Sequence, residues 1–228
     1  MKDNNSNKKE SKSSLKRKAI LEAAARVFSE KGYIESSIKN ITDEASVAVG
    51  TFYTYFNNKE EVLEQIYEEI SSMSLKIASD ASINMNDSIV KKFTLAMTCA
   101  ICVYAKNKDL SKILFVKSMG INEAFEKKRW QILDKTTTFL KGILEHLEKV
   151  HLCDINNIDI TSVLLTQSIF GVITYWLDER LTNDLQDIIF NICTYNLKAL
   201  KIEFSNDEVN KYINEVLLKD YEDVLNKN

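Results

Sequence analysis

Few residues in this chain have the types and spacing that catalysis requires. The two histidines are His146 and His151, and only His151 follows a glutamate, Glu148, at the three-residue spacing used by di-iron helices. Such a site needs two of these pairs and further glutamates, so the set is incomplete. The chain also has no phosphate-binding glycine-rich loop and no G-x-S-x-G nucleophile motif. We therefore expect no enzyme, no metal site and no cofactor.

The cysteines offer a second kind of chemistry. Cys99 and Cys102 form a C-x-x-C pair within a predicted helix, but without two more ligands nearby they make a poor zinc site. Either they sense oxidants or capture a thiol-reactive ligand, or they are small core residues. The N-terminus is polar rather than an apolar signal segment, and no run reaches the roughly 18 uninterrupted apolar residues of a membrane span. These features predict a cytoplasmic protein with reduced thiols and no membrane partner.

The composition favours an all-α fold. The 228 residues include no proline and only 5 glycines, whereas β-rich and α/β proteins of this length need many more residues that make turns. Hydrophobic residues make up 45% of the chain, which is enough for a sizeable core. Apolar residues recur at three- and four-residue spacing and predict successive helices. These helices span residues 15–31, 38–45, 49–56, 59–77, 87–106, 109–119, 121–149, 157–180, 184–202 and 206–226.

Positive charge gathers near the N-terminus. Residues 1–60 hold eleven Lys or Arg and eight Asp or Glu, a balance of +3, so the net charge of −3 leaves −6 for the remainder. Residues 1–14 contain one apolar residue, Met1, and are predicted to form a flexible basic arm. The N-terminal part therefore carries the attraction of the chain to polyanions.

Residues 32–63 carry the most specific pattern. Two short helices joined by a tight turn, the second of which exposes small and polar side chains, fit the major groove of DNA. The segment contains Gly32-Tyr33, Ile38, Ile41, Gly50-Thr51-Phe52-Tyr53, Tyr55-Phe56 and Lys59-Glu60-Glu61-Val62-Leu63. With these residues at this spacing it resembles the DNA-binding domain of the TetR family of bacterial transcriptional regulators. It departs from the family pattern at Ser46, where glycine is usual, and at Ala48, where serine is usual.

The resemblance implies a three-helix DNA-binding head over residues 15–63. In the family, the positions of Tyr53 and Tyr55 reach backbone phosphates, and a phosphate at Lys59 would explain a cation at the positive end of a helix dipole. The second helix lacks the side chains that make bidentate base contacts, so we expect Val49 and the threonine methyls to read thymine methyls. The lysines of the arm either attract DNA or form a solvated charge run. The expected DNA contacts are Ser36, Ser37, Val49, Gly50, Thr51, Tyr53, Thr54, Tyr55 and Lys59.

The resemblance further implies a helical ligand-binding and dimerisation domain over residues 64–204, followed by a C-terminal amphipathic helix over residues 205–228. The helix predicted at 157–180 is apolar almost all round, which indicates that it is covered on more than one side. Together with the next helix it is expected to form a four-helix interface between two subunits. The interface candidates are Ile169, Ile173, Trp176, Ile188 and Ile192. The candidates for effector contact, each with ordinary core as the alternative, are Phe93, Met97, Phe115, Met119, Trp130, Phe139, Phe170 and Tyr175.

These features predict a homodimeric repressor that binds a palindromic operator in double-stranded DNA. The expected place of action is the cytoplasm, at the nucleoid, and the expected inducer is a small, largely apolar ligand. The alternative is a regulator or architectural protein of the same fold that answers to a protein partner or has no inducer. The C-terminal helix is compatible with either, since it can extend the dimer interface or dock a partner. A ligand that raises the melting temperature and lowers operator affinity distinguishes the two.

Overall fold

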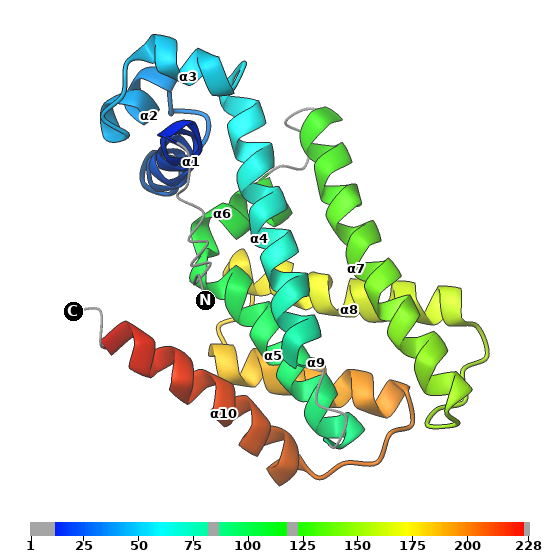
Figure 1. Cartoon of the computed structure of the whole chain (residues 1–228). Helices are drawn as coiled ribbons and strands as arrows, with labels where there is room; N and C mark the ends of the chain where they lie inside the picture. The colour runs from blue at the N-terminus through cyan, green and yellow to red at the C-terminus, as the bar shows by residue number, and fades with distance from the viewer. Residues whose placement is uncertain (1–11, 82–86, 118–122, 226–228) are drawn as a thin grey trace, which may run out of the picture. The chain divides into compact units, whose positions relative to one another are not determined.

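A computed structural model describes residues 12–81, 87–117 and 123–225, and these ranges contain helices and connecting turns with no β-strand (Figure 1). The prediction of an all-α fold is confirmed. The chain divides into two compact units, the first ending at Tyr67 and the second beginning at Glu68. Each unit is described by itself below.

Three helices and the first turns of a fourth build the N-terminal unit. Their apolar faces meet in a core that includes the fully buried side chains of Ile20, Phe28, Ile41 and Phe52. The ring of Phe28 packs edge-on against Tyr33 with 5.5 Å between centroids. The helices are α1 (Lys12–Lys31), α2 (Ile38–Glu44), α3 (Val49–Tyr55) and α4 (Lys59–Ala81), whose later turns belong to the second unit.

The first helix is longer than predicted. It begins at Lys12, three residues before the predicted start at Leu15, because nothing in the Lys-Ser-Ser sequence interrupts a helix and the Ser13 hydroxyl donates a hydrogen bond to the Tyr55 hydroxyl at 3.2 Å. Residues 12–14 are therefore helical rather than part of the predicted arm. The rest of that arm, residues 1–11, lies outside the described residues.

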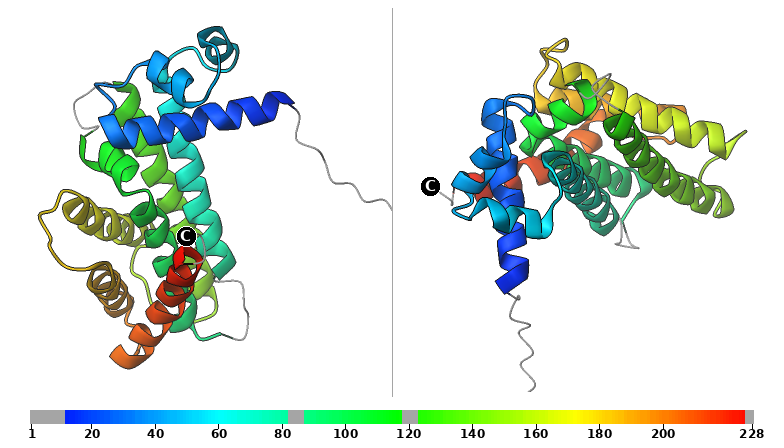
Figure 2. Two further views of the ribbon diagram at one scale, coloured as in Figure 1. Left: turned by 90° about the vertical axis from the view of Figure 1, so that its left-hand side faces the viewer. Right: turned by 90° about the horizontal axis from the view of Figure 1, so that it is seen from above.

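The second unit is a bundle of longer helices, seen from two further directions in Figure 2. The later turns of α4 join it, α7 packs along α8, and α5 lies against both α9 and α10. The predicted helix at 109–119 is a short α-helix, α6, that continues directly into a π-helical turn, η1. The elements are α5 (Ile89–Lys106), α6 (Lys108–Lys112), η1 (Ile113–Lys117), α7 (Glu123–Lys149), α8 (Ile158–Leu177), α9 (Leu185–Ala199) and α10 (Asn206–Leu225).

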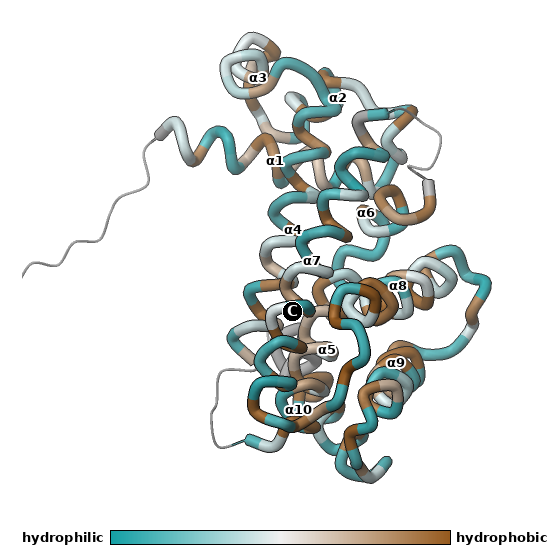
Figure 3. The backbone as a smooth tube through the Cα atoms, turned by 90° about the vertical axis from the view of Figure 1, so that its right-hand side faces the viewer, coloured by the Kyte–Doolittle hydropathy of each residue, from teal (hydrophilic) through white to brown (hydrophobic). Residues whose placement is uncertain are grey.

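Within the part of the chain that the structure describes, α8 is the one helix long and apolar enough to cross a membrane by length and composition. The apolar character of α8 and α9 is visible in Figure 3. The buried side chains of α8 include Leu165, Phe170 and Ile173, and the helix packs against α7 and α9. A core helix of a bundle meets the same criterion of length and composition, so packing accounts for the apolar side chains on the buried side of α8.

In the second unit, three helices end on residues with a left-handed backbone that are not glycine. His151, Glu179 and Lys201 follow α7, α8 and α9 and have φ values of 57°, 61° and 56°. The next residue in each case donates a backbone hydrogen bond to the carbonyl five residues earlier, as Ile202 does to Leu197 at 3.0 Å. This is the Schellman arrangement, which usually places glycine at the left-handed position. It explains how a chain with so few glycines and no proline ends its helices.

Candidate nucleic-acid interface and internal cavity

The turn between α2 and α3 has a backbone geometry that accounts for the family's glycine. Ser46 has a φ of 54°, in the left-handed region where a side chain costs ~1 kcal/mol. The Ser46 N–H donates to the Asp43 carbonyl at 3.1 Å, and the Val47 N–H donates to the Thr42 carbonyl at 3.0 Å. These bonds end α2 and turn the chain into α3 within four residues. The turn therefore forms with serine, at a local cost that glycine would not carry.

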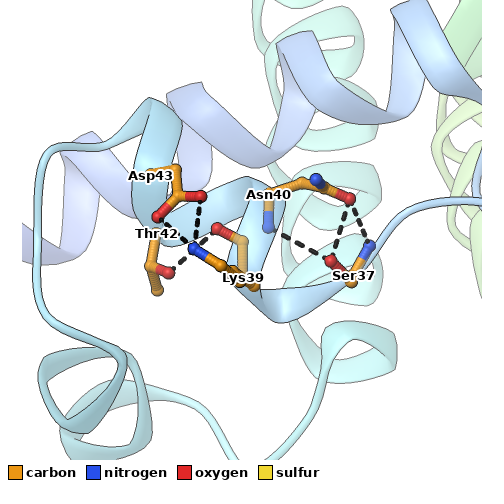
Figure 4. A network of polar contacts seen from close by, with 5 residues as sticks. All are labelled: Ser37, Lys39, Asn40, Thr42 and Asp43. Carbon is orange, nitrogen blue, oxygen red and sulfur yellow. Dashed lines mark hydrogen bonds and ion pairs between the residues drawn. The ribbon is translucent and has the colours of Figure 1, made fainter.

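The start of α2 is fixed by a reciprocal cap (Figure 4). The Ser37 hydroxyl accepts a hydrogen bond from the Asn40 N–H at 3.2 Å, and the Asn40 Oδ1 accepts one from the Ser37 N–H at 3.1 Å. One turn further, Lys39 and Asp43 pair at 2.9 Å on the exposed surface. The two caps together satisfy backbone donors that a seven-residue helix otherwise leaves open. Ser37 is exposed, so this predicted DNA contact is accessible in addition to capping α2.

The helix α3 is held by one buried side chain and presents the rest outward. Phe52 is fully buried, whereas Val49 and Tyr53 are 45% and 56% exposed and Gly50 and Thr54 are also exposed. Ala48 precedes the helix as its N-cap, and its side chain makes no capping hydrogen bond. The helix start therefore keeps backbone N–H groups that no side chain caps, and unpaired N–H groups at a helix start favour anions.

Gly50 lies on the exposed face of α3 and has free space around it. A Cβ built at this position meets no atom within 4 Å. The Thr54 hydroxyl, one turn later, donates to the Gly50 carbonyl at 3.2 Å, so it is folded back onto the helix. Thr51 is half-buried beside them. Between Val49 and Thr54, the exposed surface of α3 therefore includes small groups at Gly50 and Thr54.

The two tyrosines of α3 differ in their surroundings. Tyr53 is exposed, and its ring lies edge-on to Phe52 with 5.6 Å between centroids. Tyr55 is half-buried, and its hydroxyl accepts the hydrogen bond from Ser13 of α1. The Arg17 guanidinium of α1 lies 5.2 Å from the centre of the Phe56 ring, directly after α3. The basic first turns of α1 and the end of α3 therefore lie together, a proximity that the sequence analysis did not predict.

Lys59 has protein partners that periodicity could not reveal. Its Nζ donates to the carbonyls of Tyr33, Ile34 and Ser36 at 2.8, 3.2 and 2.8 Å and lies 4.5 Å from the centre of the Tyr33 ring. Burial lowers the pKa of Lys59, and nearby Glu60 opposes that shift. An ammonium has three N–H donors, and all three are used here. The helix dipole disfavours a positive charge at a helix start. The hydrogen bonds to these three carbonyl groups compensate for that effect at Lys59.

Ser36 points into the unit. It is buried, and its hydroxyl donates to the Gly32 carbonyl at 2.6 Å. Together with Lys59 it fixes the segment that joins α1 to α2. The family pattern contains both the Gly-Tyr pair at 32–33 and the lysine at 59. The contact between Lys59 and Tyr33 does not follow from their positions in that pattern.

The two short helices, the tight turn and the exposed face of α3 define a helix-turn-helix DNA-binding protein. The family model described as "Bacterial regulatory proteins, tetR family" matches residues 20–66. The match covers the helix-turn-helix segment and confirms the predicted resemblance to this family of DNA-binding transcriptional regulators.

Similarity to known regulators extends over most of the chain. The "Fatty acid metabolism regulator protein" of Bacillus subtilis is 29% identical over 182 residues, which cover 79% of this chain and 87% of that protein. The solved structure of the fatty acid degradation regulator FadR from Bacillus halodurans has a TM-score of 0.69 at 22% identity and covers 82% of this chain and 97% of that one. FadR from Bacillus subtilis in complex with stearoyl-CoA has a TM-score of 0.66 at 22% identity, covering 78% and 96%. These structures share the fold of the chain.

The second unit encloses an apolar cavity among α4, α5, α7 and α8. The cavity is small and partly open, with a volume of about 30 Å³. The Ser74 hydroxyl donates to the Ala100 carbonyl at 3.2 Å and is hydrogen-bonded to Tyr104. Burial raises the pKa of Tyr104 to about 12. The lining residues are Ser74, Leu75, Ala78, Met97, Ala100, Ile101, Tyr104, Thr136, Phe139, Leu140, Ile169, Phe170 and Ile173.

The predicted effector contacts fall into several environments. Three of them line the cavity: Met97, Phe139 and Phe170. Phe115 is buried next to the cavity wall, with its ring 5.0 Å from that of Phe170. Phe93 is half-buried and outside the lining, and Met119 lies outside the described residues. Trp130 and Tyr175 are 53% and 54% exposed on the surface of their helices and do not line the cavity.

The predicted dimer residues are mostly buried inside the subunit. Ile169 and Ile173 line the cavity, Ile188 and Ile192 belong to the core, and Trp176 is half-buried with its indole N–H donating to the Asn183 carbonyl at 3.2 Å. The opposite face of α8 and α9 carries exposed apolar side chains that the sequence analysis did not single out. These are Ile160, Val163, Leu164 and Tyr195, with Tyr175 beside them.

The cysteines lie apart from any cluster of metal ligands in the described ranges, where no three His, Cys, Asp or Glu side chains gather. Cys102 and Cys193 are buried, and Cys99 is half-buried. Burial raises the pKa of Cys193 to about 12, which disfavours its reactive thiolate. For Cys99 and Cys102, both interpretations stand: a pair that senses oxidants or captures a thiol-reactive ligand, and a pair of small core residues.

Proposed function

We propose that the protein is a homodimeric repressor that binds a palindromic operator through α3 and leaves it when an acyl thioester fills the cavity of the second unit. The observation that carries the DNA part is the exposed face of α3, anchored from behind by Phe52. The ligand part rests on the apolar cavity and on the relatives, one of which was solved with stearoyl-CoA.

In this proposal α3 enters the major groove with Val49, Gly50, Thr51 and Thr54 against the base edges. Val49 contributes methyl groups that suit thymine, and Gly50 lets the backbone approach closely. The uncapped start of α3, following Ala48, is available to a phosphate.

Around this helix, the proposed phosphate contacts are Ser37, Tyr53 and Tyr55. Lys59 and Ser36 belong to the same proposed set. Lys59 would have to exchange a carbonyl partner for a phosphate oxygen, and Ser36 would have to leave its buried position. The basic turn at residues 16–18 adds sequence-independent attraction.

The proposed ligand has a long apolar part. The hydroxyls of Ser74, Tyr104 and Thr136 in the cavity wall already have protein partners, since Thr136 donates to the Ile132 carbonyl at 3.1 Å. A hydrogen-bond acceptor inside the cavity would therefore displace an existing bond, whereas an alkyl chain meets side chains of Leu, Ile, Met and Phe. A saturated acyl chain matches this apolar lining, and the cavity would widen to admit it.

The dimer is proposed to form through the exposed face of α8 and α9. Ile160, Leu164 and Tyr175 recur at helical spacing on α8, and Tyr195 is 64% exposed on α9. Exposed apolar residues that form a stripe favour a protein interface. Two copies of this helix pair make a four-helix interface and place two α3 helices for the half-sites of a palindrome.

The test joins the two parts. A palindromic duplex selected from random DNA is titrated with the protein at several salt concentrations, with and without saturated acyl-CoA. The proposal predicts binding that weakens steeply with salt and is reversed by acyl-CoA. Operator binding that acyl-CoA leaves unchanged favours the alternative, control by a protein partner or by no inducer. Absence of binding to any palindrome contradicts the proposal.

A further inference from the structure

Part of the cavity wall is a cluster of three aromatic rings. Tyr104 of α5 and Phe170 of α8 line the cavity, and Phe115 of η1 packs behind them. Ring centroids lie 5.4 Å apart for Tyr104 and Phe115, 5.0 Å for Phe115 and Phe170, and 5.8 Å for Tyr104 and Phe170. All three side chains are 4–5% exposed. We call these three residues the aromatic stop.

The aromatic stop is the part of the wall where aromatic rings pack against one another, whereas Phe139 of α7 lines the cavity outside this cluster. The other lining residues of α4 and α5 are aliphatic or small, as at Ala78 and Ala100, and a methionine such as Met97 adapts its shape. Three rings in edge and tilted contact from three elements cannot each move without disturbing the others. A ligand chain that reaches them meets a wall that yields less than the wall elsewhere.

The backbone that carries Phe115 is unusual. Residues Ile113–Lys117 form a π-helical turn, a conformation that is rare and recurs at functional sites. η1 contacts both α7 and α8, two of the helices that line the cavity. The turn therefore places the phenyl ring of Phe115 against the rings of Tyr104 and Phe170 from outside the lining.

The polar group of the aromatic stop has a partner within the protein. The Tyr104 hydroxyl is hydrogen-bonded to Ser74, which in turn donates to the Ala100 carbonyl. The donor proton of the Tyr104 hydroxyl is therefore already used, and the rest of the stop offers a ligand ring faces and edges. Its surface suits a methyl terminus and disfavours a carboxylate at the end of the chain.

From this geometry we propose that Tyr104, Phe115 and Phe170 set the greatest length of acyl chain that the cavity accepts. The inference rests on the proposed acyl thioester ligand. Up to the limit, each added methylene is buried and tightens binding about fourfold. Beyond it, a further methylene must displace a ring of the close-packed cluster, and affinity stops rising or falls.

The experiment measures Kd by calorimetry for saturated acyl-CoA thioesters of increasing even chain length. It uses the full-length wild type and the variants Phe115→Leu and Phe170→Leu. Both variants shrink the stop from different sides and are expected to move the limit by two carbons or more. The first chain beyond the wild-type limit then binds about 16-fold more tightly to the variants, two methylenes at fourfold each.

Two further variants separate chain length from general loosening. Phe125→Leu removes a phenyl ring that is 1% exposed on α7 and outside the cavity lining, so it is expected to keep the wild-type limit. Phe139→Leu removes a phenyl ring that lines the cavity but does not belong to the aromatic stop, so it is expected to keep the limit as well. Phe115→Leu is preferred to alanine because a smaller truncation leaves a smaller void in the core.

The outcomes are distinguishable. If the wild type binds acyl-CoA with a chain-length limit that neither leucine variant shifts, the aromatic stop is overturned and the ligand class stands. A shift of equal size in Phe125→Leu also overturns it. If the wild type binds no acyl-CoA of any length, the proposed ligand class fails and the inference fails with it.

Discussion

A glycine inside a short helix costs stability, and Gly50 stands at the second position of α3. Alanine there is expected to stabilise the helix by about 0.5–1 kcal/mol, because a Cβ meets no atom within 4 Å in the free protein. The fold therefore does not require glycine at this position. Close approach to a DNA duplex does, in the function proposed for α3.

The first prediction concerns Gly50→Ala. We expect a small rise in the free energy of unfolding together with operator binding weakened at least tenfold, because the added methyl group keeps α3 away from the bases. Chemical denaturation and fluorescence anisotropy with an operator duplex measure the two effects. The matched control is Gly142→Ala on α7, which is also exposed with nothing within 4 Å of a Cβ. It should stabilise without changing operator affinity; equal operator binding by both variants would contradict the role of Gly50.

The second prediction concerns the helix-turn-helix turn. Ser46→Gly relieves a left-handed residue and is expected to stabilise the protein by about 1 kcal/mol in chemical denaturation. Ala48→Ser adds the missing side-chain cap of α3 and is expected to contribute about 0.5–2 kcal/mol. A loss of stability in either variant would show that the turn geometry is not as described.

For single residues, the sequence indicates whether a side chain is buried or caps a helix better than it indicates which atoms that side chain contacts. The burial of Phe52 and Ile41 and the cap formed by Ser37 are explained by helical periodicity and capping preference, both of which are local. The three carbonyl partners of Lys59 were not predictable, because residues 33–36 come within reach of it only after α1, α2 and α4 have packed.

Among the elements, α4 and α7 are joined by an ion-pair cluster beside the cavity. Glu68 of α4 pairs with Lys128 at 2.7 Å and also with Lys135, both on α7. These hydrogen bonds lower the pKa of Glu68 to about 2, with burial opposing the shift. Both helices line the cavity further along, through Ser74 and Thr136 among others. The cluster therefore fixes the spacing of two cavity walls.

The third prediction is the pH dependence of this cluster. A carboxyl whose pKa is depressed on folding stabilises the protein above its unfolded pKa of about 4.3, and that contribution disappears as pH falls toward 2. Glu68→Gln is therefore expected to destabilise the protein at neutral pH by about 1 kcal/mol after allowance for solvent screening. The difference between variant and wild type should shrink below pH 4 in denaturation curves. A difference that is constant down to pH 2 would contradict this assignment.

The order and type of the elements were predictable because each helix has a continuous apolar stripe. Their ends were less so. The π-helical turn η1 replaces the end of a predicted helix, and His151, Glu179 and Lys201 end helices without the usual glycine. In both cases packing of the bundle overrides local preference.

For the whole molecule, the proposal depends on assembly. The exposed apolar residues of α8 and α9 lie on the face opposite the residues that the sequence analysis selected for the interface, such as Ile188 and Ile192. Composition indicated that α8 is covered on two sides. It could not indicate which side faces the core, because both sides are apolar.

The fourth prediction tests this face. Leu164→Glu places a charge in the proposed interface and is expected to yield monomers by sedimentation at micromolar concentration, with loss of operator binding. Leu218→Glu on α10 is the matched control, since the two leucines are 63% and 66% exposed. The control should remain dimeric. A dimeric Leu164→Glu protein, or dissociation caused by both variants alike, would move the interface elsewhere.

Whether α3 reads a palindromic operator is tested by operator selection with the purified protein, followed by salt titration of the selected duplex. We expect a palindrome whose half-site centres are rich in A·T pairs. Its affinity for the protein should fall steeply with salt and be lost in Gly50→Glu. Enrichment of half-sites centred on G·C pairs would contradict the assignment of Val49 and the threonines. Failure to enrich any palindrome would contradict the claim that α3 reads DNA.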